Sequence, residues 1–151
     1  MSFTAAEGRR QLLDELANAI QQLGVALGAL GEAFEQLDDD SAERLEEQLF
    51  RPAQSAYGRA QRTYGEFAGR AGLPGRRFTP PGPGLPERPG EELARAIEQL
   101  ELADNTLAEL QDSMLPVEVG DRELRADLAA VRTAIAPLPA RGRELLRVIG
   151  R

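Results

Sequence analysis

Apolar residues recur at alternating spacings of four and three positions through the first quarter of the chain. The spacing holds from Leu16 to Leu37, and it places these side chains in one stripe along one face of a helix. Three aspartates follow, and aspartate favours turns. The pattern therefore predicts a first helix over residues 4–37, which begins with a capping box between Thr4 and Glu7.

The same periodicity returns after the aspartates and predicts a second helix over residues 41–71, capped by Asp40 or Ser41. Pro52 lies inside this pattern, and a proline there removes a helical hydrogen bond. The apolar register continues through Pro52, which favours a kinked helix. The alternative is a helix that breaks near Arg51 and restarts with the proline in its first turn.

Two more amphipathic stretches predict a third helix over residues 91–114 and a fourth over residues 121–149. The short stretch 115–120 breaks the pattern between them. Pro137 and Pro139 are expected to kink or interrupt the fourth helix, because neither can donate a backbone hydrogen bond.

Residues 73–90 differ from the rest of the chain, since they contain six prolines and four glycines. Such a composition is incompatible with a helix or a central strand, and it is typical of extended, partly polyproline-II segments. We expect a proline-rich connection between the second and third helices.

These elements predict an all-α protein in which residues 1–151 form one domain, an antiparallel four-helix bundle. Net charge alternates along the chain, from −6 over residues 1–40 to +1 over 41–72, and from −7 over 91–120 to +3 over 121–151. An up-down-up-down order would place the two acidic helices on a diagonal, each between basic neighbours. The charge pattern therefore favours this order, although the long connection could also cross over.

Six glycines lie inside the first two predicted helices, where each costs about 1 kcal/mol relative to alanine. They are Gly24, Gly28, Gly31, Gly58, Gly65 and Gly69. Close approach of the two helices and a glycine-rich genome are both sufficient explanations.

Composition removes most catalytic chemistry. The chain has no His, no Cys and no Lys, so the usual neutral-pH general base, thiolate nucleophiles and Schiff-base amines are missing. We therefore expect a protein that is not an enzyme and that holds no cofactor and no metal. The exclusive use of arginine among basic residues fits a GC-rich, bacterial genome.

Two groups of residues are candidate sites. Arg76, Arg77 and Phe78 combine two hydrogen-bond donors with an aromatic ring inside the proline-rich connection, and they could contact a partner unless Phe78 folds back onto the bundle.

The second group is Tyr57, Tyr64 and Phe67 with Asp104. These side chains could line a pocket between the helices. The alternatives are aromatic rings that fill the core, and an Asp104 that is exposed or pairs with an arginine of the second or fourth helix.

The leading hypothesis is a non-enzymatic interaction or scaffold protein that contacts an unknown protein, or a second copy of itself as a homodimer. The alternative is a bundle that binds a small molecule or lipid in an apolar pocket, and a carboxylate-only metalloprotein ranks third. A net charge of −7 argues against nucleic-acid binding. The chain offers no apolar run long enough for a membrane span and no signal peptide, which favours a cytoplasmic location.

Overall fold

The computed structural model describes residues 5–82, 84–85 and 87–149. Their helices are α1 (Ala5–Gln36), α2 (Asp39–Leu45), the π-helical η1 (Glu46–Phe50), α3 (Arg51–Ala71), α4 (Pro89–Asp112), α5 (Leu115–Val119), α6 (Arg122–Ile135) and α7 (Leu138–Ile149). The all-helical class is confirmed, since these described residues contain no strand. The predicted cap at Thr4 lies outside them.

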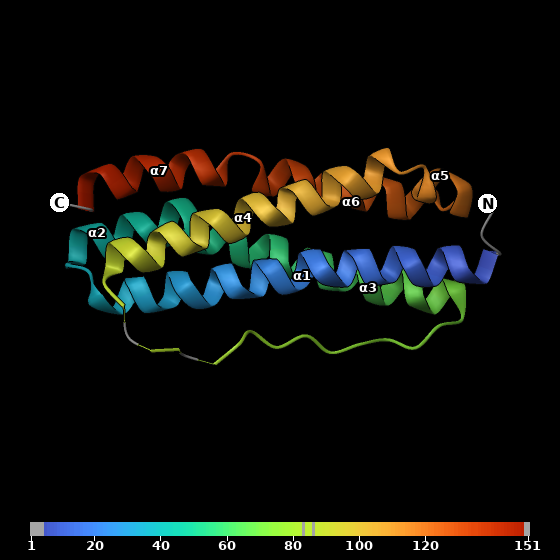
Figure 1. Ribbon diagram of the computed structural model, residues 1–151, viewed down its shortest axis with the longest axis horizontal. Helices are drawn as coiled ribbons and strands as arrows, with labels where there is room; N and C mark the ends of the chain where they lie inside the picture. The colour runs from blue at the N-terminus through green and yellow to red at the C-terminus, as the bar shows by residue number, and fades with distance from the viewer. Residues whose placement is uncertain (1–4, 83, 86, 150–151) are drawn as a thin grey trace.

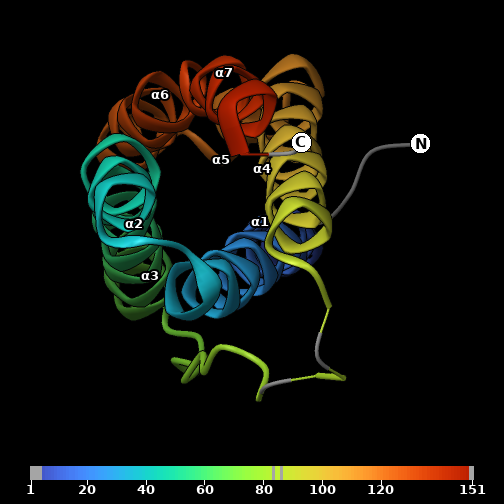
Figure 2. The ribbon, with the colours of Figure 1, turned by 90° about the vertical axis from the view of Figure 1, so that its left-hand side faces the viewer.

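The helices lie in four rods around a common core (Figures 1 and 2). α1 and α4 form one rod each, α2, η1 and α3 follow one another without a break in a third, and α6 and α7 form the fourth. α1 contacts α3 and α4, while the α6–α7 rod contacts the same two helices from the other side. The core between the rods consists mainly of leucine and alanine side chains.

The predicted up-down-up-down order is wrong. α1 and α4 are neighbours rather than diagonal partners, and α1 packs more extensively against α4 than against any other helix of the described chain. Figure 1 shows that α3 and α4 run in the same direction, so that the order is up-down-down-up. The two most acidic helices therefore lie side by side.

Burial explains why charge did not decide the order. One buried leucine contributes about 1.5–3 kcal/mol, whereas an exposed charge pair contributes about 0–1 kcal/mol. Both acidic helices also carry fully buried alanines, such as Ala26 and Ala96, which allow their backbones to approach closely. A neutral hydrogen bond, from Thr106 Oγ1 to Gln22 Oε1 at 2.9 Å, joins the two helices.

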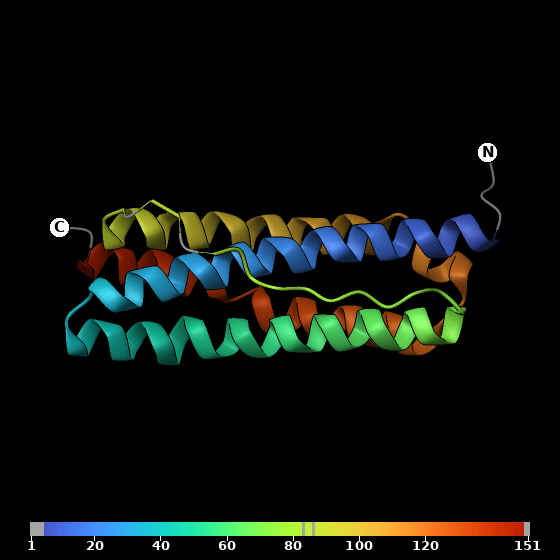
Figure 3. The ribbon, with the colours of Figure 1, turned by 90° about the horizontal axis from the view of Figure 1, so that it is seen from below.

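The proline-rich connection makes this order possible because it crosses the whole length of the bundle. It leaves α3 at one end and reaches α4 at the other, along the side formed by α1 and α3 (Figure 3). A polyproline-II chain advances about 3.1 Å per residue, so residues 73–88 reach about 50 Å. The 24 residues of α4 advance only about 36 Å at 1.5 Å per residue.

Pro52 neither ends nor breaks the helix, because a π-helical turn precedes it. The backbone stays helical from η1 into α3, and the N–H of Arg51 bonds to the carbonyl of Glu46, five residues earlier. Such π turns accommodate a proline ring that would clash with the carbonyl four residues before it. That carbonyl belongs to Gln48, and it accepts a hydrogen bond from Arg141 Nη1 of α7 at 3.4 Å.

The remaining helix ends differ slightly from the prediction. Asp38, not Asp40 or Ser41, caps α2 by accepting from the backbone N–H of Ser41 at 2.8 Å. The fourth rod is interrupted at Ala136 and Pro137, as the prolines predict. Met114, the last residue of the third predicted helix, is 54% exposed. It has a left-handed backbone with φ of 68° where α4 turns into the short helix α5.

The glycines predicted inside the first two helices do not mark helix contacts too close for a side chain. A Cβ atom on Gly24 would lie 3.5 Å from the Tyr57 ring, which is an ordinary van der Waals separation. Gly31, Gly65 and Gly69 have open space instead. The tightest position is Gly142 of α7, which the sequence did not single out: a Cβ there would lie 2.6 Å from Cγ1 of Ile97 in α4.

Candidate functional site

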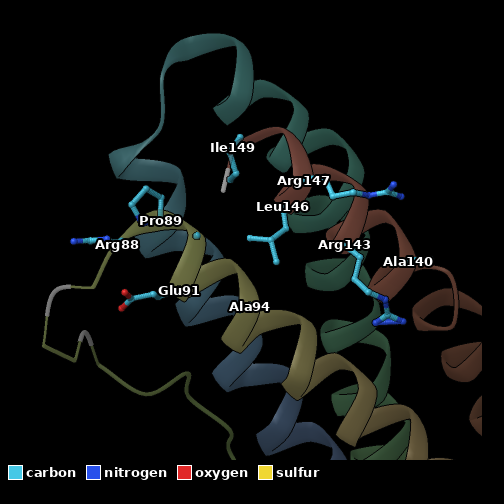
Figure 4. A pocket seen from close by; sticks show the side chains of 10 residues that line it. Arg88, Pro89, Glu91, Ala94, Ala140, Arg143, Leu146, Arg147 and Ile149 are labelled. Atoms are coloured by element: carbon cyan, nitrogen blue, oxygen red, sulfur yellow. The ribbon is translucent and has the colours of Figure 1, made fainter. Parts of the chain in front are cut away.

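A groove lies between the beginning of α4 and α7, with a volume of about 1080 Å³. Figure 4 shows Leu146 between the two helices, with Ala94 on the α4 side. The residues that line the groove are Arg88, Pro89, Gly90, Glu91, Ala94, Ala140, Arg143, Leu146, Arg147 and Ile149. Its floor is apolar, and its rim carries three arginines.

The groove continues along α4. A second depression of about 320 Å³ shares Ala94, Arg143 and Leu146 with the first and extends to Leu102 and Asn105. Leu102 is 40% exposed there. From Arg88 to Asn105 the α4 backbone advances about 25 Å at 1.5 Å per residue, so the combined groove is long, narrow and open to solvent.

Charge is unevenly distributed across this groove. The α7 side contributes Arg143 and Arg147, whereas the α4 side contributes Glu91, Glu98 and Glu101. Arg88 and the positive end of the α4 dipole lie where α4 begins. The groove therefore presents a basic wall from α7 opposite an acidic wall from α4.

Two of the rim arginines are held by exposed ion pairs. Arg143 Nη1 of α7 lies 2.6 Å from Glu101 Oε1 of α4, and Arg147 pairs with Glu144 of its own helix. Exposed pairs of this kind contribute about 0–1 kcal/mol, so an acidic ligand can replace either carboxylate at little cost.

Arg76, Arg77 and Phe78 are not presented as one exposed surface. The Phe78 ring is half-buried and meets the Tyr64 ring edge-on, with 5.3 Å between centroids. Arg76 stacks on the outer side of Phe78 at 5.0 Å, while Arg77 is exposed. Phe78 has thus folded back onto the bundle. It anchors the proline-rich connection of residues 73–88, called the crossing segment below, to α3.

Tyr57, Tyr64, Phe67 and Asp104 do not converge on one pocket. The three aromatic residues are buried on the core side of α3, and burial raises the pKa of the Tyr57 hydroxyl. Asp104 instead accepts a hydrogen bond from Arg132 Nε of α6 at 3.2 Å. This is the arginine pairing that the sequence left open as an alternative for Asp104.

Sequence reasoning missed the groove because each helix was assigned a single apolar stripe. Leu145 belongs to that stripe and is buried, but Leu146 follows directly and lies to one side of it. Val148, 55% exposed, is a further apolar residue off the stripe. Two consecutive leucines, Leu145 and Leu146, in a short amphipathic helix were therefore the feature of the sequence that could have indicated the groove.

Within the described residues, no cluster of three or more acidic, histidine or cysteine side chains is arranged to hold a metal ion. No helix in this part of the chain is long and apolar enough to cross a membrane. The chain matches no protein-family model, no curated protein and no solved structure.

Proposed function

We propose that this protein is a non-enzymatic interaction protein that binds an amphipathic helix of a partner in the groove between α4 and α7. The observation that carries the proposal is the continuous groove with an apolar floor and arginines along its α7 side. Partner helices that bind in this way insert apolar residues at positions i, i+3, i+4 and i+7.

The shape of the groove favours a helix over a small molecule or lipid. Pockets for small ligands enclose about 70–90% of the ligand surface, whereas this groove is open along its length. A stretch of about 25 Å accommodates about 16 residues of a helix at 1.5 Å per residue. The helical rods behind it provide a rigid support.

The charges specify the partner further. Arg143 and Arg147 favour aspartate or glutamate on the side of the partner helix that faces α7, and Glu98 favours a basic residue on the side that faces α4. Charge complementarity of this kind sets the orientation and the association rate more than the affinity. The partner helix is therefore expected to be acidic along one side.

A display library of amphipathic helices with random polar faces tests the proposal. Helices enriched on the wild-type protein should carry acidic residues along one side. Their affinity should fall at least about tenfold for Ala94→Asp, which places a carboxylate on the apolar floor. Ala94 is exposed, so this change does not disturb the core.

Ala129→Asp is the matched control, because Ala129 is an exposed alanine of α6 outside the groove. Its affinity for the selected helices should equal that of the wild type. Equal losses in both variants, or no enrichment of acidic residues, would contradict the proposal. Self-association that Ala94→Asp abolishes would instead identify a second copy of the chain as the occupant.

A further inference from the structure

Glu92 of α4 is a buried acid without a proper partner. It is 2% exposed, and its Oε2 atom accepts no hydrogen bond from any described residue. Nη2 of Arg95 is 3.8 Å from the other oxygen, too far for a hydrogen bond. The same Nη2 atom bonds to Glu87 instead. A buried carboxylate in this state costs more than the ~1–3 kcal/mol of a neutral unsatisfied group.

Glu92 lines a pocket of about 350 Å³ between α1, α4 and the crossing segment. The pocket is bounded by Val25, Gly28, Ala29 and Glu32 of α1, by Pro81, Gly82 and Gly84 of the crossing segment, and by Glu92 and Arg95 of α4. A Cβ atom on Gly28 would lie 3.7 Å from the carbonyl oxygen of Pro81, which places this oxygen beside α1 at the pocket.

The groups that face the pocket are mainly acceptors of hydrogen bonds. Glu92 and Glu32 offer carboxylate oxygens, and Pro81 offers its carbonyl oxygen close to Gly28. The cation, Arg95, is already engaged by Glu87. Around these groups the walls are apolar and small. The pocket therefore lacks a compact positive group with several N–H donors.

A primary ammonium group meets this requirement, because it carries one charge and three donors on a single atom. A divalent metal ion is a poorer match: calcium takes six to eight oxygen ligands, and the described acids form no cluster of three around one point. We propose that this pocket binds a small primary alkylammonium ligand, whose NH₃⁺ group donates to Glu92 and Glu32 and whose alkyl chain lies against Val25 and Ala29.

Protonation gives the proposal a specific signature. Burial raises the pKa of Glu92, and the negative charges of Glu87, Glu32 and Glu91 raise it further, while Arg95 lowers it. Below that raised pKa the carboxyl holds a proton, which an ammonium ligand must displace. Binding should therefore release a proton at pH values below that raised pKa and should strengthen as the pH rises through it.

Isothermal titration calorimetry with n-butylammonium and 1,4-diaminobutane tests the site. Both should bind saturably to the wild type, and tetramethylammonium, which has no N–H donor, should bind at least about tenfold more weakly. Glu92→Gln should weaken butylammonium binding at least about tenfold and abolish the proton release, because one charge-assisted hydrogen bond is lost. Titrations in two buffers of different ionisation enthalpy measure that proton release.

Glu109→Gln is the control, since Glu109 is an exposed acid of the same helix and the change in net charge is the same. It should leave binding unchanged, and Glu32→Gln should weaken it. Failure of both amines to bind, or equal binding by wild type and Glu92→Gln, would overturn the proposal. Tighter binding of Ca²⁺ than of either amine would overturn it in favour of a metal site.

Discussion

The contact between Gly142 of α7 and Ile97 of α4 allows a quantitative test of how the groove is built. An alanine Cβ at position 142 would lie 2.6 Å from Cγ1 and 3.0 Å from Cδ1 of Ile97. Carbon atoms at their optimal separation are about 3.5–4.0 Å apart, so the two helices must separate or the Ile97 side chain must leave its rotamer. Gly142 is also buried next to Arg143, which lines the groove.

The expected cost of Gly142→Ala follows from two opposing terms. Overpacking of a buried contact costs about 1–3 kcal/mol, and replacing a helical glycine by alanine contributes about 1 kcal/mol in the other direction. We therefore expect a net loss of about 0–2 kcal/mol in the free energy of unfolding. A loss near the upper limit would lower the melting temperature by several degrees.

Gly65→Ala isolates the packing term. Gly65 lies in α3, and a Cβ there meets nothing within 4 Å, so this change should stabilise the protein by about 1 kcal/mol. The helix-propensity gain is common to both variants. The difference between their unfolding free energies therefore measures the overpacking cost alone, about 1–3 kcal/mol.

Urea denaturation followed by circular dichroism provides both free energies. Combining Gly142→Ala with Ile97→Ala should recover at least about 1 kcal/mol relative to the sum of the single changes, because the cavity at Ile97 receives the new methyl group. Equal stabilisation by Gly142→Ala and Gly65→Ala would refute the close α4–α7 contact, and with it the position of the groove floor.

Three further predictions concern the crossing segment and the charges. Deletion of residues 76–87 should abolish the monomeric fold in size-exclusion chromatography, because the five residues left between α3 and α4 reach only about 17–18 Å, while a flexible replacement of equal length should preserve it. Glu92→Gln should flatten the pH dependence of urea unfolding. Because the pKa of Glu92 is higher in the folded than in the unfolded protein, this group stabilises the folded state below the unfolded pKa of about 4.3. That stability is lost as the pH rises through the pKa of the folded state. Asp121→Asn should act on the acid side. The hydrogen bond from Arg70 lowers the pKa of Asp121, so its contribution is present above about 3.9 and is lost as the pH falls through the folded value.

Local sequence signals predicted the helical elements well because each depends on neighbouring residues. The apolar spacing placed the ends of α1 and α3 within a few residues of their positions in the structure. Asp121 caps α6 by accepting from the N–H of Leu124 at 2.9 Å, at the residue where the fourth helix was predicted to begin. Proline placed the interruption between α6 and α7 at Pro137.

The π-helical turn before Pro52 was not predicted, although it accommodates the proline ring locally. The sequence showed a proline within a continuous apolar register, and it left a kink and a break as alternatives. The structure adds Arg141, 93 positions further along the chain from Gln48. Its guanidinium donates to the carbonyl that the proline leaves without a helical donor, and no local pattern contains that information.

The candidate sites also depend on contacts between residues that are distant in the sequence. Phe78 and Asp104 were recognised as unusual from their neighbours in sequence, but their partners Tyr64 and Arg132 come from other rods. Nothing in the sequence singles out Glu92, an acid in the first turn of its helix, where the helix dipole favours a negative charge. Its burial depends on α1 lying beside α4, and the predicted order placed these two helices apart.

The order of the rods is therefore what gives this protein its most unusual chemistry. Placing α4 beside α1 brings Glu92 close to Glu32, a second acid, and the crossing segment contributes the carbonyl oxygen of Pro81 nearby. Hydrophobic burial along α1 and α4 outweighs that local repulsion. The unfavourable acidic seam remains as a place where a cation of the right size would bind.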